Sequence, residues 1–287
     1  MPESRRGRLT VADHDRGSAG LTYVYPVVSR RAGGVSVGIN LNVNNACNWR
    51  CIYCQVPGLV RGAPPPVDLA RLESELSGFL NDVLHGDFLA TRVPVEARRL
   101  NDIALSGNGE PTSAREFDSV VDLVAKLRQQ IGVPAEVKTI LITNGSLMRR
   151  AGVQAGIRKL AALSGEVWFK VDRATSSGLR KVNNTRTDVA RMHANLEIAA
   201  HLCPTWIQTC VFAIDGAPPE DAEQQSYLDF LRQCVAARLP LKGVFLYGLA
   251  RQSFQPEAKR LSALPFAWLD AFAEKIRPLG LEVKVAP

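Results

Sequence analysis

Three cysteines, Cys47, Cys51 and Cys54, lie close together in the segment CNWRCIYC, residues 47–54. Their C-x3-C-x2-C spacing lets one loop present three thiolates to one face of an iron–sulfur cube. Three ligands for four irons leave one iron open, and an open iron can bind a substrate or a cofactor. The spacing therefore indicates an iron–sulfur site in a loop that follows the apolar run of residues 35–43.

Zinc is the main alternative for the cysteine triplet. A structural zinc site usually has four ligands, commonly in two pairs, and no second C-x2-C pair is present. Zinc would have to recruit a distant histidine or one of the other cysteines, which are Cys203, Cys210 and Cys234. A disulfide framework is not favoured because the chain is large and these cysteines are spaced irregularly. We expect all three to be buried free thiols.

A second motif, SGNGEPT at residues 106–112, follows the next strand-like segment. Its glycines allow the backbone to approach a ligand closely, and Glu110 offers an acceptor for an ammonium group. Taken alone, the motif is equally compatible with a glycine-rich turn that places a charge early in a helix.

Strand-like and helix-like segments alternate along the chain. Predicted strands cover residues 35–43, 102–105, 138–142, 166–171, 206–214 and 241–247, with a lead-in strand at 21–28 and a closing strand at 281–285. Predicted helices cover residues 68–85, 114–131, 146–163, 187–202, 219–238 and 264–279. The alternation predicts right-handed crossovers and an α/β fold with a mostly parallel sheet, arranged as a partial (βα)6 TIM-type barrel. Because both polar motifs fall at the carboxyl ends of strands, we expect them to share one site.

Further polar residues follow the later strands. Asn144 belongs to a TNG turn, which needs no function, but its position favours a place in the site. Lys170 and Asp172 lie on the same side of a strand, where opposite charges are costly unless they pair or bind a ligand. The remaining candidate substrate contacts are Asn183, Asn184, Thr185, Arg186, Gln208, Tyr247 and Arg251.

The composition describes a chain of 287 residues with 46% hydrophobic residues and a net charge of +7. We expect a flexible arm at residues 1–20 and a single domain at residues 21–287. A net positive charge of this kind is typical both of a protein with an RNA-binding face and of a protein with an ordinary solvated basic surface. No apolar stretch has membrane-spanning length, and the first residues lack a signal peptide, so a cytoplasmic protein without a membrane partner is expected.

Four stretches together, CNWRCIYCQVP, LSGNGEPT, LITNGSL and VWFKVDRAT, resemble the radical S-adenosylmethionine (SAM) superfamily, and within it the wyosine-synthase-like Fe–S oxidoreductases. The resemblance implies a [4Fe-4S] cluster on the three cysteines and SAM on its open iron. It also implies an external electron donor of the flavodoxin or ferredoxin type and cleavage of SAM to a 5′-deoxyadenosyl radical. The SAM contacts that it implies are Tyr53, Asn108, Gly109, Glu110, Pro111, Asn144, Lys170 and Asp172.

The tRNA 4-demethylwyosine synthases carry further cysteines for a second cluster near their amino terminus, whereas this chain has no cysteine before Cys47. The resemblance therefore extends to the radical SAM core and not to the tRNA–pyruvate reaction. Within the enzyme hypothesis, a tRNA nucleoside is the first candidate substrate, and a small metabolite, a peptide or a glycyl-radical partner protein are the alternatives. Outside it, the chain could be a non-catalytic RNA-binding module stabilised by zinc or a cluster, or an electron-transfer protein.

Overall fold

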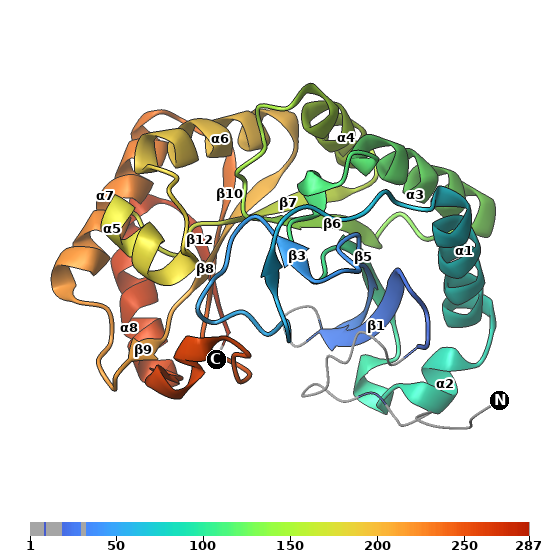
Figure 1. The fold of residues 1–287 in the computed structure, drawn as a ribbon, viewed down its shortest axis with the longest axis horizontal. Coiled ribbons are helices and arrows are strands. Elements are labelled where there is room, and N and C mark those ends of the chain that lie inside the picture. The colour runs from blue at the N-terminus through green and yellow to red at the C-terminus, as the bar shows by residue number, and fades with distance from the viewer. Residues whose placement is uncertain (1–8, 10–18, 30–32, 287) are drawn as a thin grey trace.

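The computed structural model describes residue 9, residues 19–29 and residues 33–286. The arm predicted at residues 1–20 lies almost entirely outside the described residues. Within them, six longer helices form an outer arc, and the strands of one large sheet lie inside this arc (Figure 1).

The large sheet has eight strands in the order β1-β2-β5-β6-β7-β8-β10-β12. Strand β1 is antiparallel to β2, and every other neighbouring pair is parallel. The edge strands β1 and β12 are not paired with each other, so the sheet formed by the described residues is open. The strands are β1 (Val24–Ser29), β2 (Gly34–Ile39), β5 (Leu100–Leu105), β6 (Lys138–Thr143), β7 (Gly165–Lys170), β8 (Thr205–Cys210), β10 (Leu241–Tyr247) and β12 (Glu282–Ala286). The predicted α/β fold with a partial barrel is confirmed.

Helices follow the parallel strands as the sequence predicted. They are α1 (Leu69–His85), α2 (Phe88–Arg92), α3 (Phe117–Ile131), α4 (Ala151–Ala161), α5 (Ser176–Gly178), α6 (Val189–Leu202), α7 (Asp221–Ala236) and α8 (Phe266–Ile276). A π-helical turn covers Leu179–Asn183, and 3-10 turns cover Val95–Ala97, Pro111–Ser113, Pro256–Arg260 and Arg277–Leu279. Two small sheets pair β3 (Ala46–Cys47) with β4 (Val60–Arg61), and β9 (Ala213–Ile214) with β11 (Leu261–Ser262). None of the described helices has the length and apolar character needed to cross a membrane.

Helix α1 shows how the local sequence sets these elements. Asp68 caps its first turn by accepting a hydrogen bond from the Arg71 N–H at 3.0 Å. Leu72, Leu76 and Leu80 recur at helical spacing and are fully buried in the core. Each such leucine contributes about 1.5–3 kcal/mol when it leaves water. The same core contains the apolar residues of β2, which follow a strand pattern.

Two strand predictions were too long. Strand β2 ends at Ile39 rather than at residue 43, because the Asn40 side chain accepts hydrogen bonds from the N–H groups of Asn42 (3.1 Å) and Asn108 (3.0 Å). These bonds turn the chain out of the sheet. The strand predicted at 206–214 ends at Cys210, and its last residues form β9, which pairs antiparallel with β11.

Residues 86–99 form a connector between α1 and β5 that contains α2 and a 3-10 turn. It lies near the amino ends of the strands, where the Arg99 carbonyl accepts a hydrogen bond from the Val35 N–H at 2.8 Å. The active edge of a parallel α/β sheet is at the carboxyl ends, so this connector does not cover it.

Candidate functional site

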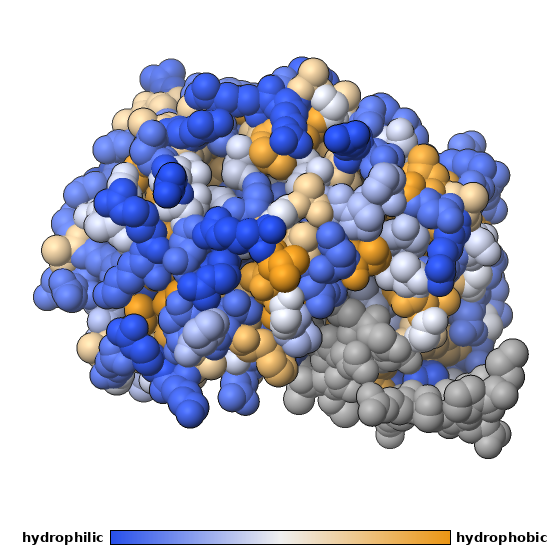
Figure 2. Space-filling model, in the orientation of Figure 1, coloured by the Kyte–Doolittle hydropathy of each residue, from blue (hydrophilic) through white to orange (hydrophobic). Residues whose placement is uncertain are grey.

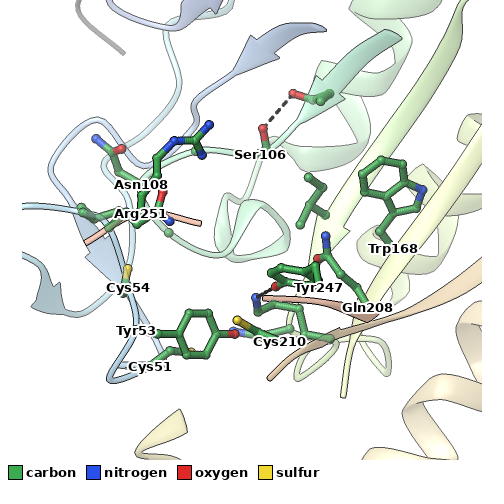
Figure 3. A pocket seen from close by; sticks show the side chains of 18 of the residues that line it. Cys51, Tyr53, Cys54, Ser106, Asn108, Trp168, Gln208, Cys210, Tyr247 and Arg251 are labelled. Atoms are coloured by element: carbon green, nitrogen blue, oxygen red, sulfur yellow. Dashed lines mark hydrogen bonds between the residues drawn. The ribbon is translucent and has the colours of Figure 1, made fainter. Parts of the chain in front are cut away.

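The three cysteines of the triplet line one cavity of about 320 Å³. They belong to a segment that we call the cysteine loop, residues 46–61, whose ends are held by the parallel pairing of β3 with β4. Residues from the carboxyl halves of the sheet strands form the opposite wall. Figure 3 shows Cys51, Tyr53 and Cys54 on one side of this cavity and Trp168, Gln208 and Tyr247 on the other.

The π-helical turn between β7 and α6 holds the cysteine loop from one side. The Ile52 N–H donates to the Val182 carbonyl at 2.8 Å, and the Asn184 side chain donates to the Arg50 carbonyl at 2.9 Å. The Arg50 guanidinium also forms two hydrogen bonds with Glu257, at 2.9 and 2.8 Å. The backbone on both sides of Cys51 is therefore fixed by residues far away in the sequence.

Residues 253–255 hold the loop at a second place. The Ser253 hydroxyl donates to the Ile52 carbonyl at 2.7 Å, and the Phe254 N–H donates to the Cys54 carbonyl at 3.0 Å. No sequence pattern pointed to these residues, because a serine in a polar connector carries no diagnostic spacing.

Two of the three thiols receive N–H donors. The Trp49 N–H points at the Cys47 sulfur at 3.5 Å, and the Asn183 side chain donates to the Cys51 sulfur at 3.2 Å. Burial raises the pKa of Cys47 to about 11 and also raises the pKa of Cys51 strongly. Thiolates in such a place need a positive charge beside them, which a metal cluster supplies. In the part of the chain that the structure describes, no three His, Cys, Asp or Glu side chains are grouped closely enough to hold a single metal ion.

Glu110 lines the same cavity and is only 2% exposed. Its carboxylate accepts hydrogen bonds from the Thr112 and Thr143 hydroxyls, both at 2.6 Å, and from the Asn144 N–H at 2.6 Å. Burial nevertheless raises the pKa of Glu110 above its ordinary value. A buried carboxylate of this kind is completed by a cation, and an ammonium group fits the remaining acceptor capacity.

The glycine beside this glutamate allows the two motifs to meet. A Cβ on Gly109 would overlap the Ala46 carbonyl oxygen and the Asn42 side chain. Asn108 lines the cavity and donates to the Asn45 side chain at 2.5 Å. The cysteine triplet fits a cluster because its thiols share one cavity wall, and the glycine–glutamate segment fits a ligand bound beside them.

Tyr53, Lys170 and Asp172 are joined in one network. Asp172 is 3% exposed and accepts hydrogen bonds from the Tyr53 hydroxyl (2.5 Å), the Asn183 side chain (2.7 Å) and the Cys210 N–H (3.0 Å). The carboxylate of Asp172 is thus used to position Tyr53 and Asn183, and Asp172 does not line the cavity itself.

Lys170 does line the cavity, where its ammonium group donates to the Tyr247 hydroxyl at 3.3 Å. Burial by itself lowers the pKa of Lys170, but the neighbouring Tyr247 and Asp172 favour the charged form and the pKa lies above its ordinary value. A fixed positive charge therefore faces the cavity. Asn144 also lines the cavity, whereas Pro111 begins the 3-10 turn after Glu110 and does not reach it.

The wall opposite the cysteine loop is mostly apolar, with Ile140, Ile142 and Trp168 among its residues. Gln208 interrupts it: this residue is 2% exposed, and its side-chain carbonyl oxygen has no hydrogen-bond partner among the described residues. Cys210 is buried, as the sequence suggested, and it also lines the cavity, which the sequence analysis did not predict. Strand alternation could have revealed it, since residues 208 and 210 share one face of β8.

The other predicted residues divide between the cavity and its rim. Tyr247 and Arg251 line the cavity. Asn184 binds the cysteine loop, and Thr185 and Arg186 border a separate hollow beside it. Cys203 and Cys234 are buried free thiols, as expected.

Sequence comparisons give partial matches. No model of a known protein family matches the chain. The chain is 26% identical over 163 residues to UPF0026 protein slr1464 of Synechocystis sp., which covers 56% of this chain and 52% of the relative. It is 26% identical over 170 residues to UPF0026 protein MJ1312 of Methanocaldococcus jannaschii, and this alignment covers 57% of this chain and 44% of the relative. The chain spans about half the length of the curated relatives it matches.

Solved structures give a broader match. The structure of TYW1 with a bound lysine-pyruvate adduct aligns with a TM-score of 0.57 at 15% identity, over 85% of this chain and 73% of that one. A radical SAM methyltransferase from Sphaerobacter thermophilus aligns with a TM-score of 0.55 at 15% identity, over 88% and 66%. The structure of anSMEcpe with bound AdoMet and Cp18Cys peptide aligns with a TM-score of 0.55 at 16% identity, over 87% of this chain and 62% of that one. The predicted resemblance is thus confirmed at the level of the fold, and the chain has the partial-barrel fold of radical SAM enzymes.

Proposed function

We propose that this protein is a radical SAM enzyme that holds a [4Fe-4S] cluster on Cys47, Cys51 and Cys54 and binds SAM against it. One observation carries the proposal: the three thiols and the Gly109–Glu110 segment, which come from different parts of the chain, line the same cavity at the carboxyl edge of a sheet with this fold. When bound, the cluster supplies an electron that cleaves SAM to methionine and a 5′-deoxyadenosyl radical, which takes a hydrogen atom from the substrate.

The chain's own residues bind and orient the reactants. Glu110 would hold the SAM ammonium, and its carboxylate is fixed by the Thr143 hydroxyl and the Asn144 N–H. Tyr53 is held by Asp172 and closes the cavity beside Cys54. The apolar wall of the cavity excludes water from the reacting groups, which limits side reactions of a radical.

The substrate is proposed to be an RNA nucleoside, with tRNA as the first candidate. The family likeness and the net charge of +7 support this choice over a small metabolite or a peptide. Reduction of the cluster requires an external one-electron donor, which we propose is of the flavodoxin or ferredoxin type. These partners belong to a cytoplasmic setting.

The test is an anaerobic assay for 5′-deoxyadenosine after reconstitution with iron and sulfide, with SAM and a strong reductant added. Cys51→Ala should abolish both the product and the cluster absorbance. The matched control is Cys234→Ala, which removes a buried thiol from α7 outside the cavity and should retain both. One bound zinc per chain with no cluster and no SAM affinity would overturn the proposal and favour a metal-stabilised binding module.

A further inference from the structure

A second hollow, also of about 320 Å³, lies beside the cavity. Its lining residues come from the cysteine loop, the turn after β6 and the segment that leads into α6. They are Asn48, Trp49, Ser146, Thr185, Arg186, Thr187, Asp188 and Arg191. Trp49 also lines the main cavity, so the two spaces adjoin.

Two arginines face this hollow without a partner. Within the described residues, neither the Arg186 nor the Arg191 guanidinium has a side-chain hydrogen bond or a carboxylate within ion-pairing distance. Some surface arginines do have one, such as Arg232 with Asp229 and Arg260 with Asp215, whereas others, such as Arg149 and Arg150, likewise have none among the described residues. Both side chains are exposed to solvent, and two guanidinium groups that face one hollow can bind an anion together.

The remaining lining adds a hydroxyl donor and one carboxylate. The Thr185 and Thr187 hydroxyls are bonded to each other at 3.0 Å, which leaves one hydroxyl hydrogen for a ligand. The carboxylate of Asp188 is the acidic group in the lining, and it is already used, since it accepts the Arg191 N–H at 2.7 Å as the cap of α6. The anion site thus depends on the two guanidinium groups and the hydroxyls, and not on the capped end of the helix.

Nearby charges point the same way. The Arg61 guanidinium donates to the carbonyl of Asn48, which lines the hollow, at 3.1 Å, and to the carbonyl of Asn184, which precedes Thr185 of the lining. Figure 2 shows strongly hydrophilic side chains gathered on this face between α5 and the cysteine loop. Three cations and one engaged carboxylate give the hollow a positive potential.

We infer that this hollow binds a phosphate group of the substrate and so places the attached nucleoside at the mouth of the cavity. The inference rests on the proposed function and specifies its substrate class as phosphorylated. The phosphate could belong to an RNA strand or to a mononucleotide, since both offer the same oxygens to Arg186 and Arg191. The shared border at Trp49 explains why a group anchored here can reach the radical chemistry next to it.

The test is binding of a fluorescently labelled single-stranded RNA to the full chain, followed by anisotropy at several salt concentrations. Arg186→Gln and Arg191→Gln should each weaken binding and reduce the slope of log K against log salt by about 0.7, the value for one contact to a single-strand phosphate. Arg232→Gln, which removes the same charge from the exposed face of α7, should leave the slope unchanged. An equal slope in all four proteins would overturn the inference.

Competition identifies the source of the phosphate. If AMP displaces the RNA at concentrations where adenosine does not, the hollow recognises the phosphate itself. If AMP binds in an Arg186-dependent way but the RNA does not bind, the substrate is a mononucleotide. Equal competition by adenosine and AMP would contradict a phosphate site. Because these measurements need no cluster, they can succeed even when the 5′-deoxyadenosine assay fails, and the two proposals are tested separately.

Discussion

The carboxylate of Asp172 should be the strongest polar support of the candidate site. Its two oxygens accept three hydrogen bonds, from the Tyr53 hydroxyl, the Asn183 amide and the Cys210 N–H. In Asp172→Asn one oxygen becomes an NH2 group, which must face at least one of these donors. The variant loses at least one hydrogen bond to a charged acceptor and leaves a buried donor unpaired, so we expect a loss of about 2–4 kcal/mol in the free energy of unfolding.

Urea unfolding followed by tryptophan fluorescence measures this loss. The matched control is Asp229→Asn on α7, where an exposed carboxylate is paired with Arg232. Exposed pairs contribute less than about 1 kcal/mol, so the control should unfold close to the wild type. Iron bound per chain after reconstitution gives a second measurement, which should fall in Asp172→Asn because Asn183 loses the acceptor that orients it toward the Cys51 sulfur.

A change below about 0.5 kcal/mol for Asp172→Asn, with normal iron binding, would refute this reasoning. It would mean that the three donors find other acceptors and that Tyr53 and Asn183 do not depend on Asp172. A large loss of stability with normal iron binding would keep the energetic argument and refute the link to the cysteine loop.

Three further predictions concern other parts of the molecule. Glu75 accepts hydrogen bonds from the N–H groups of residues 22–23, and these bonds outweigh burial and lower the pKa of Glu75. The stability that they contribute is therefore full above pH 4.5 and is lost as the pH falls through the lowered pKa. Glu75→Gln should flatten this acid dependence in urea titrations from pH 7 to 3 and should cost about 1–2 kcal/mol in the free energy of unfolding at neutral pH. Gly109→Ala would place a methyl group on the backbone of β3 and should reduce both iron binding and stability, whereas Gly78→Ala, in open space on α1, should be neutral or stabilising by about 0.5–1 kcal/mol. Gln208→Met should leave stability unchanged or raise it by about 1 kcal/mol, because it removes an unpartnered buried oxygen, and a clear loss in thermal melts would show that the glutamine has a structural partner.

The strands and their alternation with helices could be predicted from the sequence because the evidence for them is local. Each apolar run ended in a polar motif, and parallel strands bring their carboxyl ends to one edge, so the cysteines and Glu110 could be assigned to one site before any coordinates. The cap at Asp68 and the leucines of α1, which recur about once per helical turn, are local features too. These features depend on residues a few positions apart, which is the range over which sequence patterns are informative.

The supports of the cysteine loop could not be predicted in this way. Ile52 is bonded to Val182 and to Ser253, and these contacts join segments that are more than a hundred residues apart. The π-helical turn that places Val182 has no periodic pattern of its own, and its tight turn ends at Asn184, which has a positive φ of 49°. Long-range hydrogen bonds to backbone carbonyls leave no mark on residue spacing, so only the folded chain reveals them.

Unsatisfied polar groups provide independent support for where the chemistry occurs. Buried polar atoms are normally hydrogen-bonded, and a protein that leaves one unpaired loses stability. Among the described residues, Gln208 has an unpartnered buried oxygen at the cavity wall, whereas the unpaired guanidinium groups of Arg186 and Arg191 in the adjoining hollow are exposed to solvent. The partly buried thiols of Cys47 and Cys51 line the same cavity, and loss of solvation raises their pKa values. Such costs persist when a bound ligand offsets them, and Gln208, Cys47 and Cys51 line one cavity, as a ligand site there would require.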